Sequence, residues 1–290
     1  MKEYGYRFAG MNIRLLLPED MEFPKEYRLA PFAAAPTPQG HTFRFETVET
    51  LPAPAGRCLT RQPSFWIYEE GERRVRYLGN LGENWTDASV RAEHRGKDHR
   101  ILLKKSEFGN RLYCKTVLDV LAAEHLLVRS NALVFHCAFI EWKGKAVLFT
   151  APSETGKSTQ ADLWHRHRGV TIVNGDRAAI RVTESGEILA EGIPFSGSSP
   201  YCENRSLPLA GIVYLAQAPQ TTIRKLRGAQ AFARVWEGVT VNTWDRTDLE
   251  LASVLTEKIA QTVPVWYMPC TPDEDAVITL ERELERLVNV

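Results

Sequence analysis

The nine residues from Ala151 to Thr159 have the types and spacing of a phosphate-binding loop. They read Ala-Pro-Ser-Glu-Thr-Gly-Lys-Ser-Thr. The apolar run at 146–149 predicts a buried strand before them, and residues 160–164 predict the first turns of a helix after them. A strand, a loop with Gly-Lys-Ser and a helix together wrap backbone N–H groups around an anion at a helix N-terminus, where the helix dipole also favours negative charge.

Each residue type in this loop has a chemical role. Lys157 is expected to reach the β- and γ-phosphates, the Ser158 hydroxyl to hold a magnesium ion, and Gly156 to let the backbone approach phosphate closely. Ala151 stands at the usual first glycine of the motif, which is acceptable if this residue has a negative φ. The alternative is a chance Gly-Lys-Ser in a loop, against which the flanking strand and helix argue. The predicted nucleotide contacts are Ser153, Glu154, Thr155, Gly156, Lys157, Ser158 and Thr159, with ATP and Mg²⁺ as cofactors.

A carboxylate follows the next predicted strand. Residues 170–174 are mostly apolar and β-branched, and Asp176 follows them after one glycine, Gly175. One helix separates this strand from the loop, so Asp176 occupies the position from which a carboxylate meets the magnesium held by Ser158. A lone Asp after a strand is otherwise more often a cap or turn residue.

Composition excludes several classes of protein. The 290 residues are 44% hydrophobic and 25% charged, which is typical of a globular protein. The formal net charge of +0 argues against a protein that coats nucleic acid. The sequence shows no apolar stretch of transmembrane length and no signal-peptide core, so we expect no membrane partner and a cytoplasmic location. The five cysteines are scattered and predict neither a disulfide framework nor a zinc site.

The chain is predicted to divide near residue 110. Residues 1–110 are β-rich, with strands expected at 6–15, 42–48, 65–68, 74–78 and 100–103. The basic run over 91–100 is interpreted as a solvated hairpin face, with a site for an acidic peptide segment as the alternative. No chemical motif lies in this domain, so we expect it to position an acceptor or to form a homo-oligomer.

Residues 111–290 are predicted to form a domain of mixed helices and strands. The spacing of apolar residues predicts a helix over 112–128, one strand over 132–142, a hairpin over 180–191 and a loop rich in small residues over 192–201. Core strands are expected at 209–215 and 263–268, a mostly helical stretch at 228–261, and a last helix after Asp273.

At this point a family resemblance becomes specific. His136 upstream of the loop strand, the loop itself and Ile-Val-Asn-Gly-Asp-Arg over 172–177 resemble the catalytic domain of HPr kinase/phosphorylase. The segment 192–209 is similar to a block in HPr-kinase-like proteins of bacterial gene clusters, which include the kinases that modify lasso-peptide precursors. The resemblance covers about residues 111–290. It implies a mixed α+β and α/β fold: a P-loop kinase domain on a mixed sheet, as in phosphoenolpyruvate carboxykinase, after a β-rich N-terminal domain.

The resemblance implies roles for single residues. His136 matches the family histidine near the transferring phosphate, although a lone histidine is commonly a core residue. Asp176 matches the second residue of the family's Asp-Asp pair, which moves a proton between serine and phosphate. Because Gly175 stands at the first position, Asp176 alone is left to serve as metal contact or base. Glu191 is a candidate second metal contact, or a strand-end charge. Arg205 is a candidate phosphate clamp, or a member of a structural ion pair.

The function predicted from these residues is in-line transfer of the γ-phosphoryl group of ATP to a serine hydroxyl in a peptide or small protein. A lasso-peptide precursor is one such acceptor. The catalytic set is His136, Asp176, Lys157 and Arg205, and the metal set is Ser158, Asp176 and Glu191.

Three other functions remain open at this point, and a fourth is the least favoured. A small-molecule kinase would share every motif, and a non-catalytic nucleotide-binding regulator would suit Gly175. A GTPase would need an Asn-Lys-x-Asp motif that residues 241–245 do not supply. The chain is short for a carboxykinase, and its metal and substrate set is incomplete.

Overall fold

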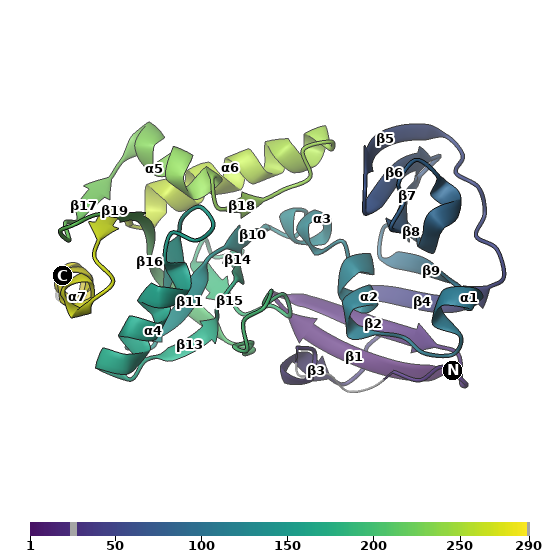
Figure 1. Cartoon of the computed structure of the whole chain (residues 1–290), viewed down its shortest axis with the longest axis horizontal. Coiled ribbons are helices and arrows are strands. Elements are labelled where there is room, and N and C mark those ends of the chain that lie inside the picture. The colour runs from purple at the N-terminus through teal and green to yellow at the C-terminus, as the bar shows by residue number, and fades with distance from the viewer. Residues whose placement is uncertain (24–27, 289–290) are drawn as a thin grey trace. The chain divides into compact units, whose positions relative to one another are not determined.

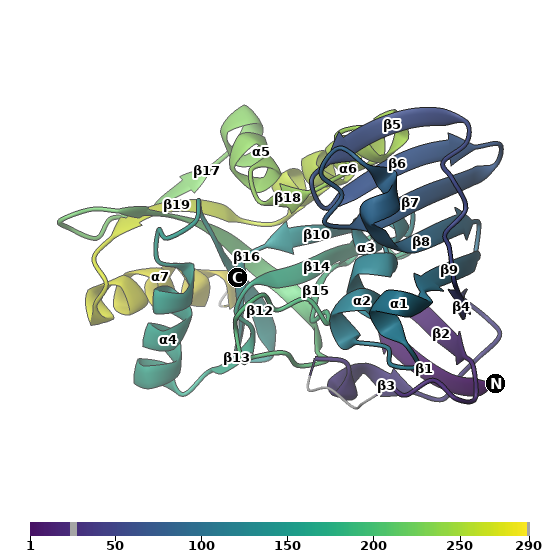
Figure 2. The same cartoon turned by 45° about the vertical axis from the view of Figure 1, so that its right-hand side comes forward.

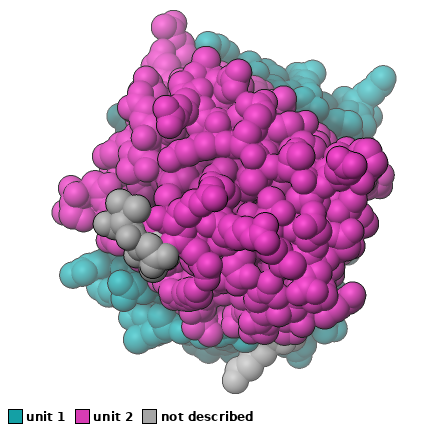
Figure 3. Space-filling view, turned by 90° about the vertical axis from the view of Figure 1, so that its left-hand side faces the viewer, with its two compact units in different colours: residues 1–122 teal, residues 123–290 magenta. Residues whose placement is uncertain are grey.

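The computed structural model describes residues 1–23 and 28–288 and divides into two compact units. Figure 3 shows the first unit, residues 1–122, in teal and the second, residues 123–290, in magenta. The described part of the chain contains seven α-helices and two large sheets, one in each unit. Both sheets combine parallel and antiparallel strands, so the fold is mixed α/β. The division falls after residue 122, whereas the sequence places a boundary near residue 110.

The first unit is built on a nine-stranded sheet with the order β3-β1-β2-β4-β9-β8-β7-β6-β5. Its elements are β1 (Lys2–Phe8), β2 (Met11–Leu17), η1 (Ala30–Phe32), β3 (Ala33–Ala34), β4 (His41–Val48), β5 (Arg57–Gln62), β6 (Phe65–Glu70), β7 (Arg73–Gly79), η2 (Trp85–Asp87), β8 (Ala88–Arg95), β9 (Asp98–Lys104), α1 (Lys105–Phe108) and α2 (Cys114–Val120). β2, β4 and β9 are parallel neighbours, and the other pairs are antiparallel. The strands predicted at 42–48, 65–68, 74–78 and 100–103 are therefore confirmed as β4, β6, β7 and β9.

The single strand predicted over 6–15 is wrong, because this segment is a hairpin. Ala9 and Gly10 have left-handed φ angles of 48° and 75°, and they join β1 to β2 in a two-residue turn. Two consecutive left-handed residues are the turn geometry that matches the twist of paired strands. The apolar residues on both sides hide the turn from an analysis of periodicity, because Ala9 is not a residue that normally signals it.

The basic run over 91–100 is a solvated hairpin face only in part, because Arg95, Lys97 and Arg100 are exposed and the other basic residues are buried. It forms the β8–β9 hairpin, in which Arg91, His94 and His99 are buried. The Arg91 guanidinium lies 2.6 Å from the Glu70 carboxylate and 2.7 Å from that of Glu93. Side chains alternate between the two faces of a strand, so a run of basic residues places charges on both faces. The buried charges are balanced within this unit.

The second unit carries the predicted phosphate loop. Its elements are α3 (Ala123–Val128), β10 (Ala132–His136), β11 (Ala138–Trp142), β12 (Lys145–Thr150), α4 (Lys157–Arg168), β13 (Thr171–Asn174), β14 (Arg177–Val182), β15 (Ile188–Glu191), β16 (Ser206–Gln217), β17 (Arg224–Leu226), α5 (Gly228–Trp236), β18 (Val239–Thr240), α6 (Arg246–Thr262), β19 (Val265–Cys270) and α7 (Glu274–Val288). The sheet has the order β13-β11-β12-β16-β15-β14-β10-β18, and β19 pairs with β16 and β17. Figures 1 and 2 show α4 beside α7, and α5 beside α6.

Helices cover both faces of this sheet because its central strands are apolar on both faces. In β12, Val147 and Phe149 pack in a cluster with residues of α4 and α7, whereas Ala146 and Leu148 pack in a cluster with residues of α5 and α6. Trp164 of α4 is fully buried in the first cluster. A strand buried on both faces reads as a continuous apolar run, as residues 146–149 do. The loop that follows β12 is therefore anchored by a well-packed strand and helix.

Two predicted elements of this region are each divided in two. The helix predicted over 112–128 breaks at Ala122, whose left-handed φ of 49° separates α2 from α3. Apolar spacing continues through the break, so the sequence does not show it. The strand predicted over 132–142 is β10 and β11 separated by Cys137. β10 pairs with β14, while β11 pairs with β12 and β13, so the chain changes partners at this point.

The remaining predicted elements of the second unit are present. The hairpin is β14–β15, the core strands are β16 and β19, the stretch 228–261 contains α5 and α6, and Asp273 precedes α7 and accepts a hydrogen bond from the Asp275 N–H. β12 and β19 each pair in parallel with β16, so the carboxyl ends of the three strands point to the same edge. No helix among the described residues has the length and apolar character needed to span a membrane.

Candidate functional site

The predicted phosphate loop connects β12 to α4. Glu154 and Gly156 have left-handed φ angles of 64° and 114°, and Ala151 is not among the residues with positive φ. The alanine at the usual first glycine is therefore sterically acceptable. Among the described residues, no side chain caps the N-terminus of α4. Its first N–H groups are left to donate to an anion.

Lys157 is the first residue of α4 and is almost fully buried. Its ammonium donates to the carbonyl oxygens of Ala151 and Pro152 at 3.0 and 3.1 Å, which holds it across the loop. Burial lowers the pKa of Lys157, while the nearby Asp176 carboxylate acts in the opposite direction. A cation at a helix N-terminus is unfavourable by itself, because the helix dipole is positive there. The Lys157 ammonium and the positive end of the α4 dipole therefore lie together, and a bound anion would balance both.

Two cavities flank the loop. Every residue predicted to contact the nucleotide lines at least one of them. The first has a volume of about 360 Å³ and is lined by His136, Ser153, Glu154, Lys157, Ser158, Ala161, Asp162, Ile172, Gly175, Asp176, Ser198, Ser199, Pro200 and Tyr201. The second, of about 390 Å³, is lined by Glu154, Thr155, Gly156, Thr159, Gln160, Leu215, Gln217, Ala218, Cys270, Thr271 and Pro272. The second cavity lies where the parallel strands β16 and β19 end. Clefts outside the carboxyl ends of parallel strands are common ligand sites.

Asn174 fixes the position of Asp176. Its side chain is fully buried, and its Oδ1 accepts hydrogen bonds from the N–H groups of Asp176 and Arg177, both at 2.9 Å. Its Nδ2 donates to the carbonyl oxygens of Ile193 and Phe195 at 3.1 and 3.3 Å. One amide therefore holds the end of β13 and the start of the loop 192–201 together. Its donor and acceptor atoms are both used, so substitution would leave buried backbone groups unpaired.

The Asp176 carboxylate lies between two nitrogen groups. Arg177 Nε donates to Asp176 Oδ2 at 3.1 Å, and His136 Nδ1 lies 3.8 Å from Asp176 Oδ1. Burial and the Lys157 ammonium lower the pKa of His136, and Asp176 only partly opposes them. The imidazole is therefore neutral at pH 7 and can accept a proton.

The structure also shows contributors that the sequence prediction did not name. Arg177, Ser198 and Tyr201 lie at or beside the first cavity. Arg177 follows Asp176 directly in the motif 172–177, and this neighbourhood is a sequence signal for it. The small residues of 192–201 indicate a loop but do not indicate its place in the site. Gly197 has a left-handed φ of 55°, and a Cβ at this residue would lie 2.8 Å from Asp176 Cγ. Only a glycine allows this close contact.

The side chain of Ser199 accounts for the presence of glycine at residue 175. A Cβ at Gly175 would lie 2.3 Å from Ser199 Oγ and 2.8 Å from Ser199 Cβ. Its own φ is not in the left-handed region, so space rather than backbone conformation selects glycine. The Ser199 side chain occupies the volume in which the first carboxylate of an Asp-Asp pair would begin.

Glu191 and Arg205 are not brought to either cavity. The buried Glu191 carboxylate accepts two hydrogen bonds from Arg181, at 2.6 and 3.0 Å, and one from Ser206 Oγ at 2.9 Å. Arg205 forms ion pairs with Glu141 at 3.2 Å and with Glu203 at 3.1 Å. For both residues the geometry agrees with the alternative of a structural role. We therefore leave them out of the proposed catalytic and metal sets.

The residues present fit a magnesium ion in part. The Ser158 hydroxyl and the Asp176 carboxylate line the same cavity, and both offer the oxygen ligands that Mg²⁺ prefers. Glu191 is engaged by Arg181, whereas the Glu154 and Asp162 carboxylates also line this cavity. Magnesium commonly takes its other ligands from phosphate and water.

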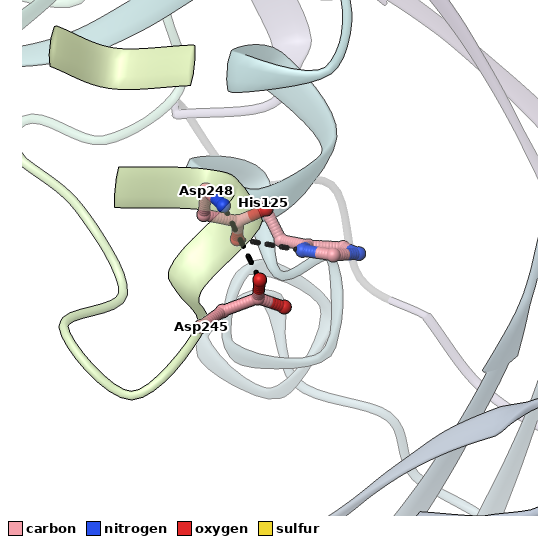
Figure 4. A group of neighbouring side chains, drawn as sticks. All are labelled: His125, Asp245 and Asp248. Carbon is pink, nitrogen blue, oxygen red and sulfur yellow. Dashed lines mark hydrogen bonds and ion pairs between the residues drawn. The ribbon is translucent and has the colours of Figure 1, made fainter. Parts of the chain in front are cut away.

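A second group of titratable side chains lies away from the two cavities. Figure 4 shows His125 of α3 and Asp248 of α6, joined by a 2.7 Å contact between His125 Nδ1 and Asp248 Oδ2, with Asp245 beside them. Asp248 is fully buried and also accepts hydrogen bonds from Arg129 Nε at 3.1 Å and Asn242 Nδ2 at 3.2 Å. Because the Arg129 guanidinium forms ion pairs with both carboxylates, at 3.1 Å with Asp248 and 3.7 Å with Asp245, we interpret the group as a network that fixes α3 to α6.

Comparisons with known proteins place the second unit in context. The family described as SynChlorMet cassette protein ScmC matches residues 114–263. No curated protein matches the sequence. Among solved structures, the Hpr(Ser) kinase/phosphatase from Coxiella burnetii is similar with a TM-score of 0.33 and 13% identity, over 54% of this chain and 99% of that chain. A likeness this weak says nothing about activity or substrate. The expected relation to HPr kinase is therefore only weakly supported.

Proposed function

The chain belongs to the family of the SynChlorMet cassette protein ScmC, and from its loop and cavities we propose that it is a kinase that uses ATP and Mg²⁺. The observation that carries the proposal is that Lys157, Ser158, His136 and Asp176 line one cavity. They offer a phosphate-binding cation, a metal-binding hydroxyl, a neutral imidazole and a carboxylate, which are the parts that phosphoryl transfer uses. The proposed acceptor is a serine hydroxyl of a peptide or small protein.

The donor would lie along the loop. The second cavity, about 390 Å³, is large enough for a nucleoside, and it shares Glu154 with the first. We assign the base and ribose to the second cavity and the γ-phosphate to the first, with the loop N–H groups and the start of α4 between them. Gln217 Nε2 donates to the Glu154 carbonyl oxygen at 3.4 Å, which ties the loop to the end of β16.

The chemistry of transfer is then assigned to the residues of the first cavity. The serine oxygen forms a bond to the γ-phosphorus as the bond from that phosphorus to the ADP oxygen breaks, and His136 or Asp176 accepts the hydroxyl proton. Lys157 and Arg177 balance the charge of the phosphoryl oxygens. Ser158 and Asp176 would hold Mg²⁺, which when bound neutralises charge on the β- and γ-phosphates.

The test is a transfer assay with γ-labelled ATP, Mg²⁺ and a panel of serine-containing peptides and small proteins. We expect label on an acceptor, and we expect Lys157→Ala to reduce transfer by at least about 100-fold, because a main electrostatic contact to the transferring group is lost. Lys145→Ala is the matched control, since this lysine begins β12 and does not line either cavity. Circular dichroism checks that both variants fold.

The other outcomes separate the alternative functions. Nucleotide binding with label on small hydroxyl compounds alone would indicate a small-molecule kinase. Nucleotide binding that depends on Lys157, without transfer to any acceptor, would indicate a regulatory nucleotide-binding protein. A folded protein that binds no nucleotide would overturn the proposal.

A further inference from the structure

The loop from Phe195 to Tyr201, here called the serine loop, lies directly on the proposed catalytic carboxylate. Its Ser199 N–H donates to the Ser196 carbonyl oxygen at 2.8 Å and closes a tight turn. Gly197, inside the turn, packs so closely on Asp176 that no side chain fits there. Ser198, Ser199 and Tyr201 line the same cavity as Lys157. The protein therefore places hydroxyl groups of its own in the cavity assigned to phosphoryl transfer.

Both ends of the serine loop are fixed, whereas its tip is exposed. Asn174 donates to the Phe195 carbonyl oxygen before the turn, and the Glu203 N–H donates to the Val173 carbonyl oxygen after it, at 2.9 Å. The Ser196 side chain is buried, but Gly197 and Ser198 are exposed. A turn held at both ends presents its central residues with little loss of conformational entropy.

Of the two serines that the serine loop contributes to the cavity, Ser198 has the available hydroxyl. Ser199 Oγ accepts a hydrogen bond from the Tyr201 N–H at 3.2 Å and fills the space beside Gly175. Among the described residues, no group forms a hydrogen bond with the Ser198 hydroxyl. An exposed hydroxyl without a partner can turn toward a phosphorus atom without first breaking a contact.

We propose that Ser198 is a site of phosphorylation by the protein's own active site, within the same molecule. This inference rests on the proposed kinase function. The Ser198 oxygen forms a bond to the γ-phosphorus of ATP, the bond from that phosphorus to the ADP oxygen breaks, and the hydroxyl proton passes to His136 or Asp176. The products are ADP and phosphoserine 198. The phosphoserine dianion lies in the cavity with Lys157 and beside Arg177, both of which can pair with it.

Phosphorylation at this residue has a consequence for the acceptor. The phosphorylated side chain occupies the cavity in which an external hydroxyl must meet the γ-phosphate, and it adds negative charge there. The modified protein is therefore expected to transfer more slowly to an external serine. Ser198 acts in this way as an internal competitor of the acceptor, with the high effective concentration of a tethered group.

The experiment incubates the full chain with γ-labelled ATP and Mg²⁺ without an external acceptor. Intact mass should increase by one phosphoryl group, and fragmentation of tryptic peptide 182–205, released between Arg181 and Arg205, should place it on Ser198. Ser198→Ala should lose the label by more than about tenfold, while Ser198→Thr should keep part of it because it retains a hydroxyl. Ser199→Ala is the matched control and should keep the label.

Two further measurements distinguish the possible failures. The labelled fraction at a given time should not change on dilution, and the Lys157→Ala variant mixed with the unaltered protein should receive no label, because the reaction is within one molecule. Calorimetric binding of ADP with Mg²⁺ is measured on the same samples. If nucleotide binds and Ser198 stays unlabelled, or the label lies on another residue, this inference is wrong while the proposed function stands. If nucleotide does not bind, the proposed function itself fails.

Discussion

At the scale of single residues, the first cavity contains charged side chains that lie close enough to interact with one another. Lys157 lies at the positive end of a helix dipole, where a buried cation is unfavourable without an anion. Arg177 adds a second cation, and Asp176 supplies one carboxylate between them. Glu154 and Asp162 also line this cavity, so its protein groups carry charges of both signs. Lys157, Arg177 and the uncapped N-terminus of α4 are the positive groups available to an anion.

Gly175 gives the first prediction at this scale. Gly175→Asp should lower the free energy of unfolding by about 1–3 kcal/mol, because its Cβ would overlap the Ser199 hydroxyl and force the serine loop outward. Urea unfolding measures the stability, and limited proteolysis measures the exposure of the loop.

The matched test of Gly175 is a double substitution. Ser199→Gly removes the obstructing side chain, so Gly175→Asp with Ser199→Gly should recover most of the lost stability, although Ser199→Gly by itself only loses the contact with the Tyr201 N–H. A Gly175→Asp variant as stable as the unaltered protein would show that the serine loop does not pack at Gly175.

His136 gives a prediction about pH. Burial and Lys157 lower the pKa of His136, so its neutral, basic form persists to a pH below the ordinary histidine value of about 6.5. The value of kcat/KM for transfer should therefore fall with acidity only below that pH. His136→Gln should reduce kcat by about 100-fold or more and remove this acidic limb. His167→Gln, on α4 and outside both cavities, is the control. An unchanged pH profile in His136→Gln would show that Asp176 alone accepts the proton.

At the scale of elements, the site depends on hydrogen bonds and ion pairs between segments that are distant in sequence. The Asn174 amide joins β13 to the serine loop. The network of His125, Arg129 and Asp248 joins α3 to α6, and α3 leads directly into β10, which ends at His136. Hydrogen bonds to buried charged groups are the stronger ones in proteins. His136 itself is held by its pairing with Arg177 of β14 and by its N–H, which donates to the Gly238 carbonyl oxygen at 2.7 Å.

Substitution of Asp248 tests how much the contacts between α3 and α6 stabilise the protein. Asp248→Ala should lower the free energy of unfolding by about 1–3 kcal/mol, because the buried Asn242 amide and the partly buried His125 lose their hydrogen-bond partner, whereas the exposed Arg129 keeps its contact with Asp245. Glu250→Ala, on the same helix, removes only an exposed i,i+4 pair with Arg246 and should leave the stability almost unchanged. Urea unfolding at pH 7 compares the two variants.

The pH dependence of this effect has a definite sign. Burial by itself would raise the pKa of Asp248, but the hydrogen bonds from His125 and Asn242 and the charge of Arg129 hold it below the ordinary value. The stabilisation is therefore complete above the unfolded pKa of about 3.9 and is lost as the pH falls through the lower folded pKa. The difference between the unaltered protein and Asp248→Ala should shrink below about pH 4. A difference that stayed constant to pH 2 would contradict this assignment.

At the scale of the whole molecule, the chain consists of two compact units with separate sheets. Every residue that lines the two cavities beside the loop belongs to the second unit. The second unit also has apolar clusters on both faces of its sheet, so it contains a core of its own. The first unit supplies none of these lining residues, and the role proposed for it is to position the acceptor or to form an oligomer.

This separation predicts how a fragment behaves. Residues 123–290 produced alone should fold and bind ADP with Mg²⁺ as tightly as the full chain, because the donor site is complete within them. Circular dichroism and calorimetry test the two parts of the prediction. Transfer to an external peptide should fall in the fragment if the first unit positions the acceptor. A folded fragment that does not bind nucleotide would show that the first unit contributes to the donor site.

What the sequence determined by itself is the loop 151–159, with its strand before and helix after. These features depend on neighbouring residues, and periodicity and spacing report neighbours directly. The groups that join them from distant parts of the chain are identified only in the folded protein. Glu191 and Arg205 are drawn to Arg181, Glu141 and Glu203 by strand pairing and local packing, whereas the serine loop is folded onto Asp176 by the Asn174 amide. Pairing between distant segments leaves no period in the sequence, so these partners could be identified only once the chain was folded.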